Sequence, residues 1–490
     1  MTDKGALPNS RMGDVGDPGF ARNNASGAIY LSTIPFSGNG VQVFASTNNG
    51  SSFGKPADAG KTIAGPDKPW ITVDNASGNG QGNIYVSLTS FAASTNIYLV
   101  RSTNGGSKWG SPVTIASGTV QGSNVVVGTD HSVYVFWLDG NGSAEQILVR
   151  KSTDQGKSFG PAVIVATLRT TGVNGDLGLN GGFRTNAFPQ AAINPVNGNI
   201  YVVFDDVGQA SGDRSDAYFV QSTDGGATWS SPVKLNDDTT TNDQWFPALA
   251  VTPDGSHLGI FWYDRRLDPA NNLIDRFGVV GSISGGTVTF GANFRVTDTS
   301  FPGVIGNDPN VVSNYMGDYD TAAANNTTFY TAWVDNRLAA TAQDVFFTTV
   351  SVAGHAPVGA GRLASLVVMP PVPPGAAQPG PWSAGLGSVA FRAGTSAPVE
   401  AALLALPSSQ SPAPLLLAAP MVSNVTLPAQ ALDQVFTAVN GQDQPLLFAR
   451  GWLDLSDYSS LDGGLLVALA RVQGGERTPL QGFDALLLAL

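Results

Sequence analysis

The chain has 490 residues, of which 42% are hydrophobic and only 13% charged, together with 59 glycines and 31 prolines. This length favours two or three domains, and the abundance of turn-forming residues favours short strands over long surface helices. The net charge of −12 argues against nucleic-acid binding, and the absence of cysteine excludes disulfides and thiolate metal sites.

Residues 1–14 are interpreted as an N-terminal extension. The opening residues contain no apolar segment of the kind that directs secretion, and no later stretch is apolar for long enough to predict a membrane-spanning helix. We therefore expect an extracellular, cell-surface or virion- or particle-associated location, without a signal peptide in this chain.

Four eight-residue segments share the pattern Ser-x-Asp/Asn-x-Gly-x-x-aromatic. They begin 56, 50 and 70 residues apart, and each lies between two strand-like runs. This spacing is typical of one four-stranded propeller blade per repeat. We call these segments the repeat turns: Ser46–Phe53, Ser102–Trp109, Ser152–Phe159 and Ser222–Trp229.

The shared residues of the repeat turns predict hairpin chemistry. The Ser hydroxyl and the Asp or Asn side chain can accept hydrogen bonds from the N–H groups of the turn, the Gly supplies a positive φ, and the aromatic ring packs beneath. These residues are therefore predicted to be structural and not catalytic: Ser46, Asn48, Gly50, Phe53, Ser102, Asn104, Gly106, Trp109, Ser152, Asp154, Gly156, Phe159, Ser222, Asp224, Gly226 and Trp229.

A second strand type recurs six times, for example as GNIYVSLTS, HSVYVFWLDG and LGIFWYDRR. A degenerate fifth turn lies around residues 282–290, and the sixth repeat has none. We therefore predict an all-β fold, a six-bladed β-propeller over residues 15–355. Residues 356–382 are rich in Pro, Gly and Ala and are interpreted as a linker.

Residues 383–490 are predicted to form a small β-sandwich. Their apolar runs have strand length, and the segment contains no lysine and only twelve charged residues. Low charge favours self-association or docking to a partner through this C-terminal domain. A large apolar core with ordinary loops is the alternative.

The repeat turns resemble the Asp-boxes (BNR repeats) of sialidases and related propellers. The resemblance covers the propeller only, and it implies six blades and a hydrolase with three substrate-binding arginines, a tyrosine–glutamate nucleophile and an aspartate acid/base. This chain departs from that pattern: Thr33-Ile34-Pro35 stands where an Arg-Ile-Pro element is expected, and Glu145 is the single glutamate of the propeller.

Blade topology predicts which face carries function. The repeat turns are third turns, so the loops after the second strands and the crossings between blades open on the opposite face, where the long polar loops gather. The residues there that suit a ligand are Trp245, Tyr263, Arg265, Arg266, Tyr315, Asp335 and Arg337; weak catalytic candidates are Asp264, Asp318 and Tyr319. Structural ion pairs are the alternative for the Asp–Arg pairs, since the motif repeats between blades.

The propeller's acidic loops raise the possibility of calcium. Carboxylates of the 205–216 and 237–243 segments could supply oxygen ligands, but their spacing does not match the helix-flanked calcium loop, and solvated loops are the alternative. No cofactor is required by the pattern.

Three functions remain open. The first is a non-catalytic propeller that binds a glycan or a surface protein and is displayed through its C-terminal β module. The second is an exo-acting, sialidase-like glycoside hydrolase, for which two aspartates would suffice chemically. The third is a purely structural subunit of an extracellular assembly.

Overall fold

The computed structural model describes the part of the chain that holds the predicted propeller. The described residues are 7–8, 14–35, 38–172, 175–303, 314–337 and 344–352. The predicted linker 356–382 and β-sandwich 383–490 lie outside them, as does most of the N-terminal extension. Within the described residues, no helix has the length and hydropathy needed to cross a membrane.

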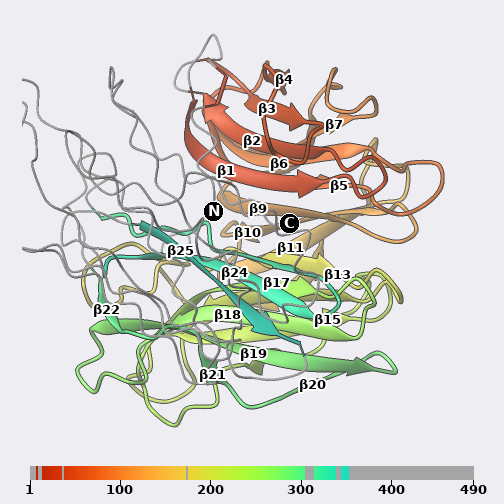
Figure 1. The fold of residues 1–490 in the computed structure, drawn as a ribbon. Helices are drawn as coiled ribbons and strands as arrows, with labels where there is room; N and C mark the ends of the chain where they lie inside the picture. The colour runs from red at the N-terminus through yellow and green to blue at the C-terminus, as the bar shows by residue number, and fades with distance from the viewer. Residues whose placement is uncertain are drawn as a thin grey trace, which may run out of the picture. The chain divides into compact units, whose positions relative to one another are not determined.

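The described residues form six antiparallel sheets, which follow one another along the chain (Figure 1). In each sheet the strands are hydrogen-bonded in the order in which they occur in the sequence. The strands of the first three sheets are β1 (Asp14–Arg22), β2 (Ile29–Pro35), β3 (Val41–Ser46), β4 (Ala57–Ala59), β5 (Pro66–Val73), β6 (Ile84–Phe91), β7 (Thr95–Ser102), β8 (Val113–Ser117), β9 (Val120–Val127), β10 (Val133–Asp139), β11 (Gln146–Ser152) and β12 (Val163–Thr167).

The last three sheets differ in their outer strands. In the fifth sheet β21 and β22 also pair with β19, and the sixth sheet has three strands within the described residues. The strands are β13 (Gln190–Ile193), β14 (Ile200–Asp206), β15 (Asp216–Ser222), β16 (Val233–Lys234), β17 (Gln244–Val251), β18 (His257–Asp264), β19 (Leu273–Ser284), β20 (Thr287–Phe290), β21 (Phe294–Arg295), β22 (Phe301–Pro302), β23 (Thr321–Ala324), β24 (Thr328–Asp335) and β25 (Asp344–Ser351).

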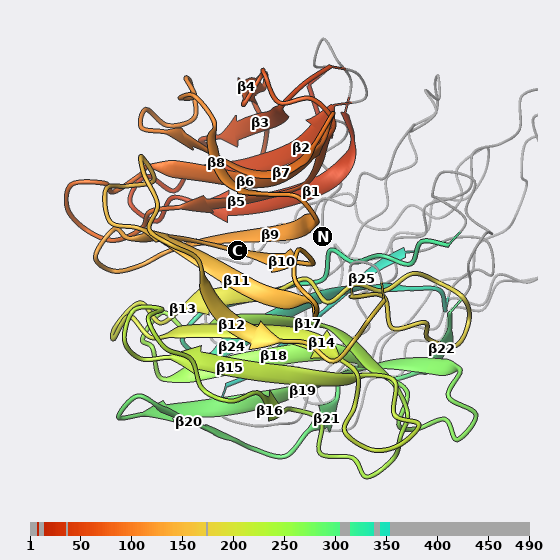
Figure 2. The ribbon, with the colours of Figure 1, turned by 180° about the vertical axis from the view of Figure 1, so that it is seen from behind.

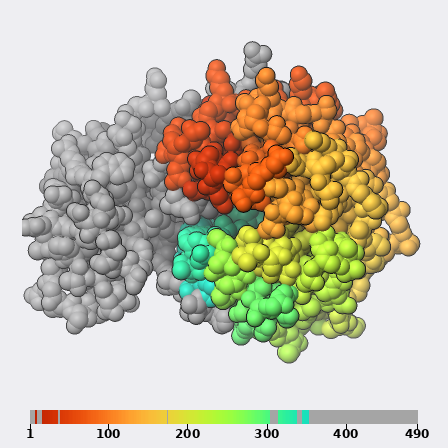
Figure 3. All heavy atoms as spheres, turned by 90° about the vertical axis from the view of Figure 1, so that its right-hand side faces the viewer, coloured from red at the N-terminus to blue at the C-terminus, as the bar shows by residue number. Residues whose placement is uncertain are grey.

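The six sheets are the blades of a propeller. The first strand of each blade contacts the first strand of the next, in the order β1, β5, β9, β13, β17 and β23, which places these strands innermost. Figures 2 and 3 show the blades following one another from red to teal, and an ion pair between Lys68 and Asp318 connects the sixth blade with the second. The predicted six-bladed all-β propeller is confirmed.

Alternating side chains of the second strands pack the blades against each other. On β14, Ile200, Val202 and Phe204 join the apolar cluster shared with the third blade, whereas Tyr201 and Val203 join the cluster shared with the fifth. Because successive side chains of a strand point to opposite faces, a strand that is buried on both faces has a continuous apolar sequence. The core is therefore a series of layers between blades.

Each repeat turn connects the third and fourth strands of a blade. In the fourth blade, the Ser222 hydroxyl accepts a hydrogen bond from the Gly226 N–H at 2.9 Å and donates one to Asp224 at 2.8 Å. Gly226 has a φ of +86°, which favours glycine, and the Trp229 ring meets Phe136 of the preceding blade edge to face. The same Ser-to-Gly bond occurs in the other three turns.

Replacement of Ser222 by Ala is expected to lower the free energy of unfolding by about 1–3 kcal/mol, because the buried Gly226 N–H loses its acceptor. Urea unfolding followed by tryptophan fluorescence measures the change. The control is Thr223→Ala in the same turn, since Thr223 is exposed and its loss should change stability by no more than about 0.5 kcal/mol. Equal stability of the two variants would contradict this role of the turn.

Candidate functional site

The first strands share one unusual backbone position at the centre of the propeller. Five residues before the last residue of each first strand, the chain carries Asp17, Lys68, Gly122, Phe188, Phe246 and Tyr319, which we call the central positions. A proline follows in four blades, at Pro18, Pro69, Pro189 and Pro247. The strand pairing shifts at this point in β1, β5 and β17.

The backbone at these positions is left-handed where the shifts occur. Asp17, Lys68 and Phe246 have φ angles of +57°, +45° and +50°, which are uncommon for residues with a side chain. A β-bulge of this kind bends the strand and redirects a side chain, and bulges are frequent next to active sites. The central positions are therefore where the fold aims side chains differently from a regular strand.

Lys68 of the second blade contacts residues of three other blades through its side chain and its backbone. Its ammonium group lies 3.1 Å from the Asp318 carboxylate and donates a hydrogen bond to the Asp318 carbonyl oxygen at 2.9 Å. It also lies 3.8 Å from the centre of the Tyr319 ring and 5.6 Å from that of Phe188. The Lys68 backbone N–H donates to the Asp17 carboxylate at 2.9 Å. We call Asp17, Asp67, Lys68, Asp318 and Tyr319 the central cluster.

The carboxyl groups of the central cluster have pKa values displaced in opposite directions. Burial, reinforced by the Asp17 carboxylate, raises the pKa of Asp67 to about 6, although Lys68 and a 3.3 Å hydrogen bond from Gln121 oppose this. Burial also acts to raise the pKa of Asp318, but the Lys68 charge and hydrogen bonding outweigh it, so that this pKa is lowered. At mildly acidic pH the cluster therefore holds a protonated and an ionised carboxyl group.

The other two acidic groups of the cluster, Asp17 and Tyr319, also have raised pKa values. Burial raises the pKa of Asp17, against the hydrogen bond and charge of Lys68. Burial and then the carboxylates of Asp17 and Asp318 raise the pKa of Tyr319 well above its ordinary value, so its hydroxyl keeps its proton. Tyr319 is thus a neutral phenol in this setting.

Residues of the two longest crossings surround Asp318. The Tyr315 hydroxyl donates a hydrogen bond to one Asp318 carboxylate oxygen at 2.7 Å, and the Asn186 amide donates to the other at 2.9 Å. Arg184 is exposed, and its guanidinium lies 5.1 Å from the centre of the Tyr315 ring. The cluster therefore has an exposed cation beside it that is free to meet solvent.

The central cluster lies on the face where long loops were predicted. The central positions stand at the beginning of the first strands, where the chain enters each blade from a crossing. The repeat turns follow the third strands, which run antiparallel to the second and thus end on the opposite face. Of the predicted site residues, the structure brings Tyr315, Asp318 and Tyr319 together here.

Three other predicted ligand residues lie in the interior of the fifth blade. Trp245, Tyr263 and Arg265 are each no more than 1% exposed. The Trp245 and Tyr263 rings are stacked with their centres 5.4 Å apart, and the Arg265 guanidinium lies 4.9 Å from the Trp245 ring. Arg265 donates to the Asp243 carboxylate at 2.9 Å, so its charge is already paired. Arg265 thus forms a structural ion pair, the alternative drawn from the sequence, but its partner is Asp243 and not the adjacent Asp264.

Arg266 and Arg337 take part in a repeated motif at the end of the second strands. In the fifth blade, the Trp262 indole and the Arg266 guanidinium both donate to the Asp264 carboxylate at 2.9 Å. In the sixth blade, the Asp335 carboxylate accepts from Trp333 at 3.2 Å and from Arg337 at 2.8 Å. Arg266 also contacts Asp237, and Arg337 contacts Asp298. A feature repeated at equivalent places serves the scaffold more often than a single site.

Asp264 shares its environment with this motif and not with the central cluster. It is fully buried, and its hydrogen-bond partners are Trp262, Arg266 and Gln244. Of the three weak catalytic candidates, the structure therefore groups Asp318 and Tyr319 and leaves Asp264 elsewhere.

Asp17, Asp67 and Lys68 were missed by sequence reasoning. The signal that could have found them is a charged residue directly before, or two before, a proline in an otherwise apolar first strand, as in Asp17-Pro18 and Asp67-Lys68-Pro69. The equivalent places in the fourth and fifth blades carry Phe188 and Phe246. Comparing the first strands with each other would have shown the exception.

The acidic loops proposed for calcium use several of their carboxylates in protein contacts. Asp206 accepts hydrogen bonds from the backbone of Arg169 and Thr170, and Asp216 lies 3.1 Å from the Lys234 ammonium group. Among the residues that the structure describes, no group of three or more His, Asp or Glu side chains is placed to hold a metal ion.

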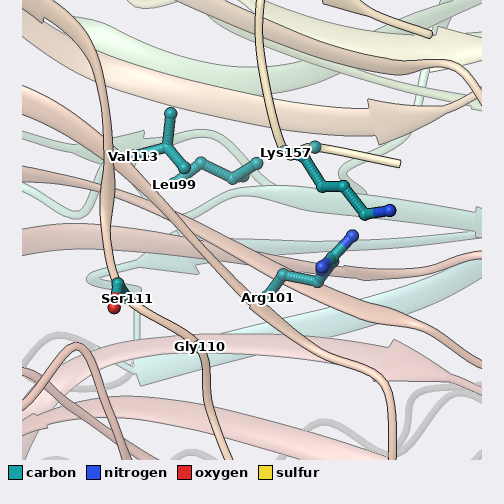
Figure 4. Close-up of a pocket in the computed structure, with 7 residues that line it drawn as sticks. Leu99, Arg101, Gly110, Ser111, Val113 and Lys157 are labelled. Carbon is teal, nitrogen blue, oxygen red and sulfur yellow. The ribbon is translucent and has the colours of Figure 1, made fainter. Parts of the chain in front are cut away.

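A pocket of about 240 Å³ lies away from the central cluster, between the second and third blades. Arg101 of β7 and Lys157 of the third repeat turn both contribute to its wall (Figure 4). Arg101 donates to the carbonyl of Gln155 at 2.7 Å, and Lys151 makes the matching contact with Gly225 of the next turn at 3.5 Å. The Arg101 side chain therefore belongs to a repeated link between blades.

No protein-family model matches the sequence, and no curated protein matches it. Similar solved structures include the α-L-arabinofuranosidase Arb93A of Fusarium graminearum, with 12% identity over 69% of this chain and 92% of that one and a TM-score of 0.43. An α-L-arabinanase of Penicillium chrysogenum has 13% identity, covers 70% and 97%, and has a TM-score of 0.44. The sialidase NanB of Streptococcus pneumoniae has 8% identity, covers 66% of each chain, and has a TM-score of 0.42. These matches do not assign the chain to a family.

Proposed function

We propose that the protein hydrolyses glycosidic bonds at the central cluster, with Asp67 as the proton donor and Asp318 as the ionised carboxylate. The observation that carries the proposal is the pair of aspartates whose pKa values lie on opposite sides of the ordinary value. Glycoside hydrolysis needs one carboxylic acid and one carboxylate at the same bond, and environments that separate two pKa values assign these roles.

The proposed chemistry follows from the two protonation states. Asp67 gives its proton to the leaving oxygen of the glycosidic bond, while the negative charge of Asp318 stabilises the cationic sugar or activates the attacking water. Water adds to the anomeric carbon, and one of its protons stays in the new hydroxyl group of the sugar. The other proton passes to the deprotonated Asp67 where Asp318 only stabilises the cation, or to Asp318 where Asp318 is the base, and solvent then returns a proton to Asp67. The Tyr319 and Phe188 rings, which already flank Lys68, supply apolar faces of the kind that sugars stack on.

The charge of the cluster favours a neutral glycoside. Three carboxyl groups meet one lysine there, and among the residues that the structure describes, the exposed Arg184 is the second cation beside Asp318. The sialidase resemblance implies arginines that hold a substrate carboxylate, yet Arg265, Arg266 and Arg337 are each paired with aspartates of the scaffold. A substrate without a carboxylate of its own fits a cluster with more carboxyl groups than cations better than a sialoside does.

This proposal reverses the order of functions drawn from the sequence. Non-catalytic binding ranked first because the tyrosine–glutamate nucleophile has no counterpart at the expected motif. The aspartates of the central cluster offer a different acid and base, and the resemblance of the repeat turns to Asp-boxes supports a carbohydrate substrate. Display on a surface or particle, and self-association through residues 383–490, stay separate proposals.

Glycoside turnover is expected to fall as the pH rises through about 6, because Asp67 must carry a proton to act as the donor. The raised pKa means that the acid is present below this value and lost above it. A panel of neutral disaccharides and alkyl glycosides of hexoses and pentoses, whose alkoxide leaving groups need protonation, measures the rate between pH 4 and 8, with a sialylated disaccharide as the sialoside for comparison. Turnover of the sialoside alone would contradict the neutral substrate, and no turnover of any panel member would contradict hydrolysis.

A further inference from the structure

We propose that Lys68 is a positioning residue, whose ammonium group holds Asp318 ionised and thereby leaves the reactive proton on Asp67. The geometry behind it is the placement of Lys68 between the Asp318 carboxylate and the Tyr319 and Phe188 rings. The inference rests on the hydrolytic function proposed above, which it deepens by stating how the two aspartates acquire different roles.

The fold itself does not require a charge at this position. The equivalent central positions of the fourth, fifth and sixth blades carry Phe188, Phe246 and Tyr319, so an aromatic side chain satisfies the packing there. A buried lysine is costly unless it is paired, because its ammonium group loses hydration. Lys68 is only 7% exposed, and its ammonium group is paired with Asp318. An aromatic residue at this position would avoid the cost of removing a charge from water.

The contacts of Lys68 are unequal among the carboxylates. Its ammonium group reaches Asp318 directly, whereas its backbone N–H, which carries no net charge, is the group that contacts Asp17. The attraction of Lys68 is the largest influence that opposes burial at both aspartates, but at Asp67 the repulsion from Asp17 is larger still and adds to the effect of burial. The lysine therefore favours ionisation of Asp318 over that of Asp67.

Other charged and titratable groups also face Asp318 and have to be kept constant in a test. They come from the first strands of two blades and from the two crossings: Asp17, Asp67, Arg184, Tyr315, Tyr319 and Asp320. Replacing only Lys68 leaves all of them in place.

The test compares Lys68→Met and Lys68→Phe, which remove the charge, with Lys68→Arg, which keeps it. Full-length protein labelled with carboxyl-13C aspartate is titrated by NMR, and the Asp318 resonance is identified by its loss in Asp318→Asn. In the neutral variants we expect Asp318 to titrate at higher pH than in the wild type, and in Lys68→Arg close to the wild type. If the protein turns over a glycoside, the acid limb of its pH profile should move the same way, with roughly tenfold lower turnover for each pH unit of displacement.

The NMR titration does not depend on activity, so the two proposals fail separately. A wild type without glycosidase activity contradicts the proposed function, whereas an unchanged Asp318 titration in a folded neutral variant overturns the role of Lys68. A shifted titration with an unshifted pH profile also overturns it, because Asp318 ionisation would then not matter to the reaction. If both neutral variants fail to fold while Lys68→Arg folds, Lys68 is a stability residue and the inference is wrong.

Discussion

Replacement of Asp67 by Asn is expected to lower kcat for a neutral glycoside by about 10²- to 10⁴-fold, with little change in KM. The amide has nearly the shape of the carboxylic acid but cannot release a proton to the leaving oxygen, and a positioned general acid contributes a factor of this size. Steady-state kinetics at pH 5, below the pKa of about 6 for Asp67, measures the loss under conditions in which the wild-type acid is protonated.

Two further measurements make this result specific. An aryl glycoside with a good leaving group should lose much less rate, because its leaving oxygen needs no protonation. Asp154→Asn is the matched control: Asp154 lies in a repeat turn on the opposite face, and Asn48 and Asn104 occupy the same place in the first and second blades. An equal loss for the neutral glycoside and the activated aryl glycoside, or an equal loss in Asp154→Asn, would contradict the role of Asp67 as proton donor.

Replacement of Arg265 by Ala is expected to lower the free energy of unfolding by about 3–5 kcal/mol, because it leaves the buried Asp243 carboxylate without its partner. The change also removes the guanidinium that lies against the Trp245 and Phe183 rings. Urea unfolding measures the loss.

The outcome decides between the two roles considered for Arg265. Arg214→Ala is the control, since Arg214 is exposed and its guanidinium donates to the backbone carbonyl of Gly178 at 2.6 Å. Its loss should change stability by no more than about 0.5 kcal/mol. If Arg265→Ala were instead as stable as the wild type and selectively impaired in ligand binding, the ligand-binding role predicted from the sequence would stand.

Much of the fold can be predicted from the sequence because its signals are local. Each repeat turn contains its Ser, Gly and aromatic residue within eight positions. The second strands contain continuous apolar runs such as Ile200–Phe204, and such runs indicate a strand that is buried on both faces. A hairpin turn needs no distant partner to fix its conformation, so a turn pattern that repeats at the spacing of a blade predicts the propeller.

The central cluster has no local signature. Lys68 and Asp318 are 250 residues apart, and they meet only because the ring of blades closes. Burial was the other unknown: arginines such as Arg265 suit a substrate carboxylate by their type, and the sequence does not show that aspartates of the scaffold already hold them. The Trp-x-Asp-x-Arg repeat in the fifth and sixth blades was a clue to that outcome for Arg266 and Arg337, but Arg265, which pairs with Asp243, lies outside it.

The bulge at the central positions allows the side chain at the propeller axis to change while the rest of the fold stays the same. The left-handed backbone and the proline that follows it occur together in the first, second and fifth blades, where the position holds an acid, a lysine and an aromatic residue. A single codon change at one of these positions alters the charge at the axis without any insertion or deletion in the loops. If the proposed hydrolysis takes place at the central cluster, point mutation of these positions should change the substrate preference and leave the blades intact.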